Sequence, residues 1–138
     1  MSVPKRILFV CVENTGRSQM AEAFLRKYAP CIEVHSAGTQ PKSELNPVVV
    51  QVMNEIGIDI TQQKPKMLTD EMISESTTVN MGCMDKESCP ALFVKDTVDW
   101  EIQDPKGKDI EQVREIRDQI KSQVLNFLKN LEIQNGLH

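Results

Sequence analysis

The chain has 138 residues, a length typical of one domain with its own core, so we expect a single domain over residues 1–138. Apolar residues make up 40% of the sequence and charged residues 26%, as in ordinary soluble proteins, and the net charge of −4 argues against nucleic-acid binding. No apolar run approaches membrane-spanning length, and residues 1–5 lack the apolar core of a signal peptide. We therefore expect a cytoplasmic protein without nucleic-acid or membrane partners.

A strand, a short loop and a helix are predicted first. Arg6–Val10 is a short, apolar, partly β-branched run with polar residues on both sides, which is typical of a buried strand. Apolar residues repeat at helical spacing in Gln19–Tyr28, and Ser18 before them is a residue type that often caps a helix. The loop thus leads into a helix N-terminus, where unpaired N–H groups and the helix dipole favour an anion.

Three further helices are predicted along the chain. Val48–Ile56 follows Pro47, which is favourable at a first helical position. Thr69–Glu75 starts with a capping residue and has two acidic residues in its first turn. Asp109–Leu131 carries one continuous apolar stripe and is the clearest helix, whereas Asp59–Met67 is polar and is expected to be a loop.

Three further strands alternate with these helices. They are expected at Cys31–Ser36, at Thr77–Met81, and within either Ala91–Val94 or Thr97–Trp100. Alternation of strands and helices predicts an α/β fold, a three-layer sandwich whose four-stranded parallel sheet has helices on both faces. Ligands of such sheets bind beyond the carboxyl ends of the strands, which is where the loop after Val10 lies.

The first loop carries the candidate chemistry. Cys11 and Arg17 stand at its ends with five residues between them. Beside a helix N-terminus and a cation, the pKa of a thiol falls from about 8.5 to roughly 3.5–7.5, which gives a thiolate nucleophile. The guanidinium of Arg17 can grip two oxygens of a tetrahedral anion. The spacing alone is weak evidence, because Cys11 could be a buried apolar side chain and Arg17 a surface residue; the strand–loop–helix context favours a site.

Two more cysteines, Cys83 and Cys89, follow the third predicted strand. Parallel strands end at one edge of a sheet, so Cys83 and Cys11 are expected to share a rim. The spacing matches neither a paired zinc site nor a thioredoxin-type redox motif. In a helix the two residues would be about 9 Å apart along the axis, whereas disulfide Cα atoms lie about 4.4–6.8 Å apart. The segment must therefore loop out for them to pair. Cys31 is expected to be a simple buried thiol.

The segment Cys11–Phe24 (CVENTGRSQMAEAF) resembles the active-site loop of the low-molecular-weight protein tyrosine phosphatase superfamily, which includes arsenate reductases of the same fold. The resemblance extends through Ser36–Thr39 (SAGT), the Asp104-Pro105 pair and the terminal helix, so it covers nearly the whole chain. It implies a low-molecular-weight phosphatase-like, flavodoxin-like topology for the sheet.

The resemblance also implies roles for individual residues. Asn14 would hold the shape of the loop, and Ser18 would donate a hydrogen bond to the Cys11 thiolate. Asp104 would be the general acid that protonates the oxygen leaving arsenic or phosphorus, although Asp-Pro is also a common turn pair. The other loop positions would offer backbone N–H groups to the anion: Val12, Glu13, Thr15 and Gly16. Of these, a carboxylate at Glu13 repels an anion unless it points outward.

The pair Cys83 and Cys89 resembles the thioredoxin-coupled arsenate reductases and is absent from the phosphatase pattern. This resemblance implies that Cys11 attacks arsenate, that a Cys11–Cys83 disulfide forms as arsenite leaves, and that Cys89 moves the disulfide to Cys83–Cys89. Arsenate, with phosphate or sulfate as mimics, and thioredoxin or a similar thiol reductant are the expected partners, and no cofactor is expected. Two alternatives stay open for this pair: Cys83 and Cys89 could be incidental thiols, and the chain could resemble related reductases that have a single catalytic cysteine and use a small thiol and a glutaredoxin-type partner.

Some of these reductases bind potassium near the loop. Asn14, Glu22 and Ser36 match ligand positions of that site, but the later loop carries Lys64 and Lys66 in place of oxygen ligands. We therefore expect no metal, with a lysine ammonium in place of the ion; a potassium-dependent rate would count against this.

Two other interpretations stay open. A phosphatase would need only Cys11, Arg17 and Asp104 and would hydrolyse phosphate monoesters through a phosphocysteine. The chain has no aromatic residue near 40–45, which disfavours a phosphotyrosine pocket, but Trp100 keeps it possible. Residual phosphatase activity is compatible with the reductase, since phosphate and arsenate share shape and charge. The second open interpretation is a non-catalytic sensor of an anion or of the redox state.

Overall fold

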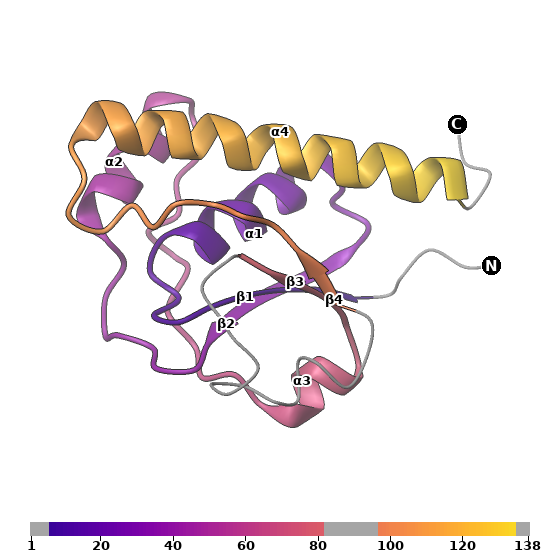
Figure 1. The fold of residues 1–138 in the computed structure, drawn as a ribbon. Helices are drawn as coiled ribbons and strands as arrows, with labels where there is room; N and C mark the ends of the chain where they lie inside the picture. Colours follow the sequence, from indigo (N-terminus) through magenta and orange to yellow (C-terminus); the bar gives the residue numbers. More distant parts are fainter. Residues whose placement is uncertain (1–5, 82–96, 135–138) are drawn as a thin grey trace.

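Four parallel strands form the centre of the computed structural model, which describes residues 6–81 and 97–134 (Figure 1). The elements in chain order are β1 (Arg6–Cys11), α1 (Arg17–Tyr28), β2 (Glu33–Gly38), α2 (Pro47–Glu55), α3 (Asp70–Ser74), β3 (Thr77–Asn80), β4 (Thr97–Asp99) and α4 (Ile110–Gln134). Within these described residues, none of the helices combines the length and the apolar content that crossing a bilayer requires.

The strands are ordered β2-β1-β3-β4 and all neighbours are parallel. Cys11, the last residue of β1, pairs with Gly38 of β2, while Val10 pairs with Asn80 of β3. The predicted α/β fold with a four-stranded parallel sheet and flavodoxin-like topology is confirmed. The fourth strand occupies the later of its two predicted positions; the earlier one, Ala91–Val94, lies outside the described residues.

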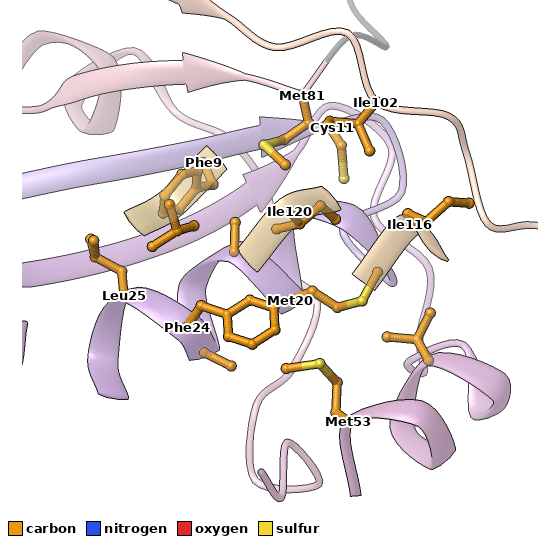
Figure 2. Close-up of a cluster of buried hydrophobic side chains, with 14 of the residues drawn as sticks. Phe9, Cys11, Met20, Phe24, Leu25, Met53, Met81, Ile102, Ile116 and Ile120 are labelled. Atoms are coloured by element: carbon orange, nitrogen blue, oxygen red, sulfur yellow. The ribbon is translucent and has the colours of Figure 1, made fainter. Parts of the chain in front are cut away.

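Helices cover both faces of the sheet. α1, α2 and α4 lie on one face and α3 on the other, so the molecule has three layers (Figure 1). The alternation of β1 divides its side chains between two apolar clusters: Phe9 and Cys11 join the larger one, and Leu8 joins the smaller. Figure 2 shows Cys11 within the larger cluster, near Met81 and Ile102. The nucleophile therefore stands where the core meets the carboxyl edge of the sheet.

The starts of the helices follow their capping residues, with one exception. The side chain of Asn46 accepts the N–H of Val48 at the start of α2, and that of Thr69 accepts the N–H of Met72 at the start of α3. The prediction that Ser18 caps α1 is wrong. Gly16 occupies the cap position without a side-chain hydrogen bond, and Ser18 lies inside the helix, where its hydroxyl contacts Cys11.

Charged side chains tie α2 to α4. Arg114 of α4 donates to both carboxylate oxygens of Glu55, with Nη2 to Oε2 at 2.6 Å, and Arg117 donates to Glu55 Oε1 and to the carbonyl of Val52. Hydrogen bonds from Arg114, and then its charge and that of Arg117, lower the pKa of the Glu55 carboxyl. The ionised form of Glu55 thus stabilises the fold.

We expect Glu55→Gln to lower the free energy of unfolding at neutral pH. Because the folded-state pKa of Glu55 is lowered, its contribution is present above the ordinary value of 4.5 and is lost as the pH falls through the folded-state value. Urea unfolding of the variant and the wild type at several pH values measures this. The two stabilities should converge in acid, and a constant difference down to pH values well below 4.5 would contradict the assignment.

Candidate active site

Asn14 gives the loop between β1 and α1 its shape. It is fully buried and has a left-handed backbone, with φ of 57°. Its side-chain oxygen accepts the backbone N–H of Lys66 at 2.8 Å and the side-chain amide of Gln19 at 3.1 Å. Its side-chain nitrogen donates to Ser18 Oγ at 2.7 Å. The loop is therefore held from the helix that follows it and from a segment some fifty positions away in sequence.

These bonds determine which groups face the sulfur of Cys11. The backbone N–H of Lys66 can only donate, so it fixes Asn14 Oδ1 as the acceptor and leaves the Asn14 NH₂ group to donate to Ser18. Ser18 Oγ accepts that bond and lies 2.9 Å from Cys11 Sγ, where its hydroxyl can donate to a thiolate. The backbone N–H of Asn14 donates to the same sulfur at 3.2 Å. Two donors aimed at one sulfur favour its thiolate form.

Arg17 is anchored by carbonyls from the neighbouring loops. Its side chain is 8% exposed, and Nη1 donates to the carbonyl of Ile102 at 2.7 Å and to that of Met81 at 3.3 Å. Nη2 lies 3.6 Å from Asp104 Oδ2. The guanidinium thus has a fixed orientation between the end of β3 and the loop that carries Asp104.

A cavity of about 290 Å³ opens over this loop. Its lining consists of Cys11, Val12, Glu13, Thr15, Gly16, Arg17, Asp104 and Lys106. Thiol, guanidinium and carboxyl from two distant parts of the sequence therefore line one small polar hollow, while Asn14 and Ser18 lie buried beneath it. The residues Cys83 and Cys89, which the sequence places in the same site, lie outside the described residues.

Gly38 supports the loop between β1 and α1, residues 12–16, from the side of β2. This loop is called the cradle below. A Cβ built on Gly38 would lie 2.4 Å from the carbonyl oxygen of Val12 and 3.1 Å from Asn14 Cβ. The same Val12 carbonyl accepts the N–H of Gln40 at 2.9 Å. The SAGT segment singled out in the sequence therefore packs directly against the cradle, at a distance that only glycine allows.

Glu22 is a buried carboxylate close to Lys66, whose backbone N–H bonds Asn14. Glu22 accepts bonds from Ser36 Oγ at 2.6 Å and from Arg26 Nε at 3.0 Å, and Lys66 Nζ lies 3.7 Å from Glu22 Oε1. Lys66 Nζ also donates to the carbonyl of Lys64 at 3.1 Å. Of the two lysines considered as replacements for a potassium ion, Lys66 is the one whose ammonium lies in this polar cluster.

Several contributors to the site could not be recognised from the sequence. The carbonyls of Met81 and Ile102 carry no residue-type signal, and Gln19 acts through its contact with Asn14. The sequence singles out Lys66 for its ammonium, but the group that bonds Asn14 is its backbone N–H. Lys106 could have been recognised from its position, because it lies two residues after the candidate general acid Asp104. Cys31, expected to be buried, is exposed because β2 begins only at Glu33 and leaves Cys31 on the connection before it.

Comparison with known proteins identifies the family. Residues 6–136 match the low molecular weight phosphotyrosine protein phosphatase family. The chain belongs to this family. A protein from Halobacterium salinarum, provisionally named an arsenate reductase, is 39% identical over 126 residues, which cover 86% of this chain and 87% of that protein. The arsenate reductase of Staphylococcus aureus strain Newman is 34% identical over 126 residues, which cover 89% of this chain and 95% of that protein.

Solved structures of this family include enzymes with different activities. A thioredoxin-dependent arsenate reductase from Corynebacterium glutamicum superposes with a TM-score of 0.78 at 37% identity; the match covers 94% of this chain but 62% of that longer one. An arginine phosphatase from Geobacillus stearothermophilus superposes with a TM-score of 0.80 at 32% identity and covers 95% of each chain. The low molecular weight phosphatase fold is therefore shared by reductases and phosphatases, and the activity must be argued from residues.

We expect Gly38→Ala to destabilise the protein by about 1–3 kcal/mol, because the new methyl group would meet backbone atoms of the cradle that cannot move cheaply. Gly16→Ala is the matched comparison. There a Cβ would lie 2.9 Å from Pro105 Cγ, a side-chain atom and not backbone, so this variant should lose less stability. Urea unfolding measures both. A Gly38→Ala protein as stable as the wild type would contradict the close packing of Gly38 on Val12.

Proposed function

We propose that this protein reduces arsenate to arsenite with Cys11 as its nucleophile. The observation that carries the proposal is the sulfur of Cys11, which accepts the N–H of Asn14, lies 2.9 Å from Ser18 Oγ and lines a cavity with Arg17 and Asp104. The loop between β1 and the N-terminus of α1 is suited to a tetrahedral oxyanion. The arsenate reductases among the relatives support arsenate as the substrate.

The first step forms a covalent adduct. The Cys11 thiolate attacks arsenic and an As–O bond breaks. The departing oxygen takes a proton from Asp104 and leaves as water, so that a thiol–arsenate adduct remains. Arg17, held by the Met81 and Ile102 carbonyls, compensates the negative charge of the anion without having to reorient.

The second step transfers two electrons to arsenic. The Cys83 thiolate attacks the sulfur of Cys11, the As–S bond breaks, and its electron pair stays with arsenic, which departs as arsenite. A Cys11–Cys83 disulfide results. The Cys89 thiolate then attacks Cys83 and releases the Cys11 thiolate, and thioredoxin reduces the Cys83–Cys89 disulfide. Because Cys83 and Cys89 lie outside the described residues, this part of the proposal rests on their sequence positions and on the thioredoxin-dependent relative.

Phosphatase activity is the second candidate, because the same three groups would serve it and because a relative with 32% identity is an arginine phosphatase. None of the described residues that line the cavity is aromatic. Trp100, the residue that left a phosphotyrosine pocket possible, is 6% exposed and packs between Phe9 and Phe127 in the core. These contacts favour a small inorganic anion over an aryl phosphate.

We expect both Cys83→Ser and Cys89→Ser to abolish turnover when arsenate is supplied with thioredoxin, thioredoxin reductase and NADPH, since each removes one sulfur of the relay. NADPH consumption measures turnover. Mass spectrometry of the Cys89→Ser protein should show a trapped Cys11–Cys83 disulfide. Cys31→Ser is the matched control and should turn over at the wild-type rate, because Cys31 is an exposed residue outside the cavity.

Unchanged turnover in Cys83→Ser or in Cys89→Ser would remove the three-thiol relay. Hydrolysis of an aryl phosphate by the wild type, without any turnover of arsenate, would favour the phosphatase.

A further inference from the structure

Glu13 is a carboxylate in the lining of a cavity that is suited to an anion. Its Oε2 lies 3.2 Å from Lys106 Nζ and 3.9 Å from Lys42 Nζ, and its side chain is 27% exposed. The two ammonium groups compensate its charge, so Glu13 does not oppose the bound anion with a full unpaired charge. This pairing explains why the cradle tolerates an acid, and it raises the question of what the acid does.

The partner Lys106 belongs to the loop of the general acid. The backbone N–H of Lys106 donates to Asp104 Oδ1 at 3.0 Å, while Arg17 Nη2 faces Asp104 Oδ2 at 3.6 Å. Whatever fixes Lys106 therefore also fixes the Asp104 carboxyl. The side chains of Asp104 and Lys106 are 57% and 66% exposed, so little packing restrains these two side chains on either side of the buried Pro105.

The ring of Pro105, which lies between Asp104 and Lys106, also contacts the cradle. A Cβ on Gly16 would lie 2.9 Å from Pro105 Cγ, which means that the proline ring rests on the glycine. Residues 104–106 thus contact the cradle at three successive points: Asp104 on Arg17, Pro105 on Gly16, and Lys106 on Glu13. The Glu13–Lys106 ion pair is the outermost of these three contacts and holds the loop against the edge of the cavity.

We propose that Glu13 and Lys106 form a bridge that positions Asp104 over the cradle, so that both act as positioning residues for proton transfer. The proposal rests on the proposed function only in that Asp104 is taken as the general acid. A bridge between exposed charges is weak, so we expect about a two- to fivefold loss of kcat when it is broken.

The bridge has a kinetic signature that a purely electrostatic role lacks. Removing the negative charge of Glu13 should strengthen binding of an oxyanion and lower KM, whereas removing the positive charge of Lys106 should raise KM. Both changes release the Asp104 loop, so both should lower kcat. Opposite shifts in KM together with equal losses in kcat identify a bridge.

The experiment is steady-state arsenate reduction, in the thioredoxin-coupled assay, by Glu13→Gln, Lys106→Met and the double variant. The double variant should lose no more kcat than either single one, because the second change has no bridge left to break. In an Asp104→Asn background, Glu13→Gln should leave kcat unchanged. Glu115→Gln and Lys129→Met, exposed residues of α4, are the matched charge controls, and melting curves check folding.

Wild-type kcat in Glu13→Gln would overturn the proposal, as would multiplied losses in the double variant or a loss of kcat that persists in the Asp104→Asn background. If the wild type hydrolyses p-nitrophenyl phosphate and does not reduce arsenate, the proposed function fails. The same variants assayed on that phosphate ester then decide the bridge by the same criteria.

Discussion

The side chain of Asn14 is the constraint on which the site depends. The loop that directs the Asn14 N–H at the Cys11 sulfur turns through the left-handed region at Asn14, and asparagine tolerates that region better than most residues do. The cost is offset because its carboxamide is satisfied by Lys66, Gln19 and Ser18 in a buried position. Since these partners come from α1 and from the loop beyond α2, the cradle is as stable as the packing between those segments.

This construction leaves the reacting groups set before an anion arrives. The Asn14 amide holds the Ser18 hydroxyl 2.9 Å from Cys11 Sγ, and Arg17 is held by two carbonyls. Preorganised donors of this kind need no reorganisation during the reaction. Phosphate and arsenate would be treated alike up to the covalent adduct, so the branches of the family must differ afterwards, in whether water or a second thiolate attacks the adduct.

Local sequence patterns predicted the fold well because they depend on neighbouring residues. Pro47 at the start of α2, the cap Thr69, the apolar stripe of α4 and the alternation of strands and helices led to the observed elements and to a four-stranded parallel sheet. The motif residues of the site were predictable from the sequence, but the residues that hold them in place were not. The capping prediction for Ser18 followed from its residue type alone, whereas its contact with Cys11 was implied only by the family resemblance. Lys66 and Lys106 reach the cradle through tertiary contacts.

Phosphate binding by Asn14→Gly tests the central claim most directly. Glycine adopts the left-handed backbone more readily than asparagine but has no carboxamide, so this variant keeps the conformation accessible and removes the bonds to Lys66, Gln19 and Ser18. Isothermal titration with phosphate should show an affinity at least about tenfold weaker than that of the wild type, the loss expected for a single hydrogen-bonded support. Wild-type affinity in a folded Asn14→Gly protein would contradict the claim that the Asn14 side chain builds the cradle.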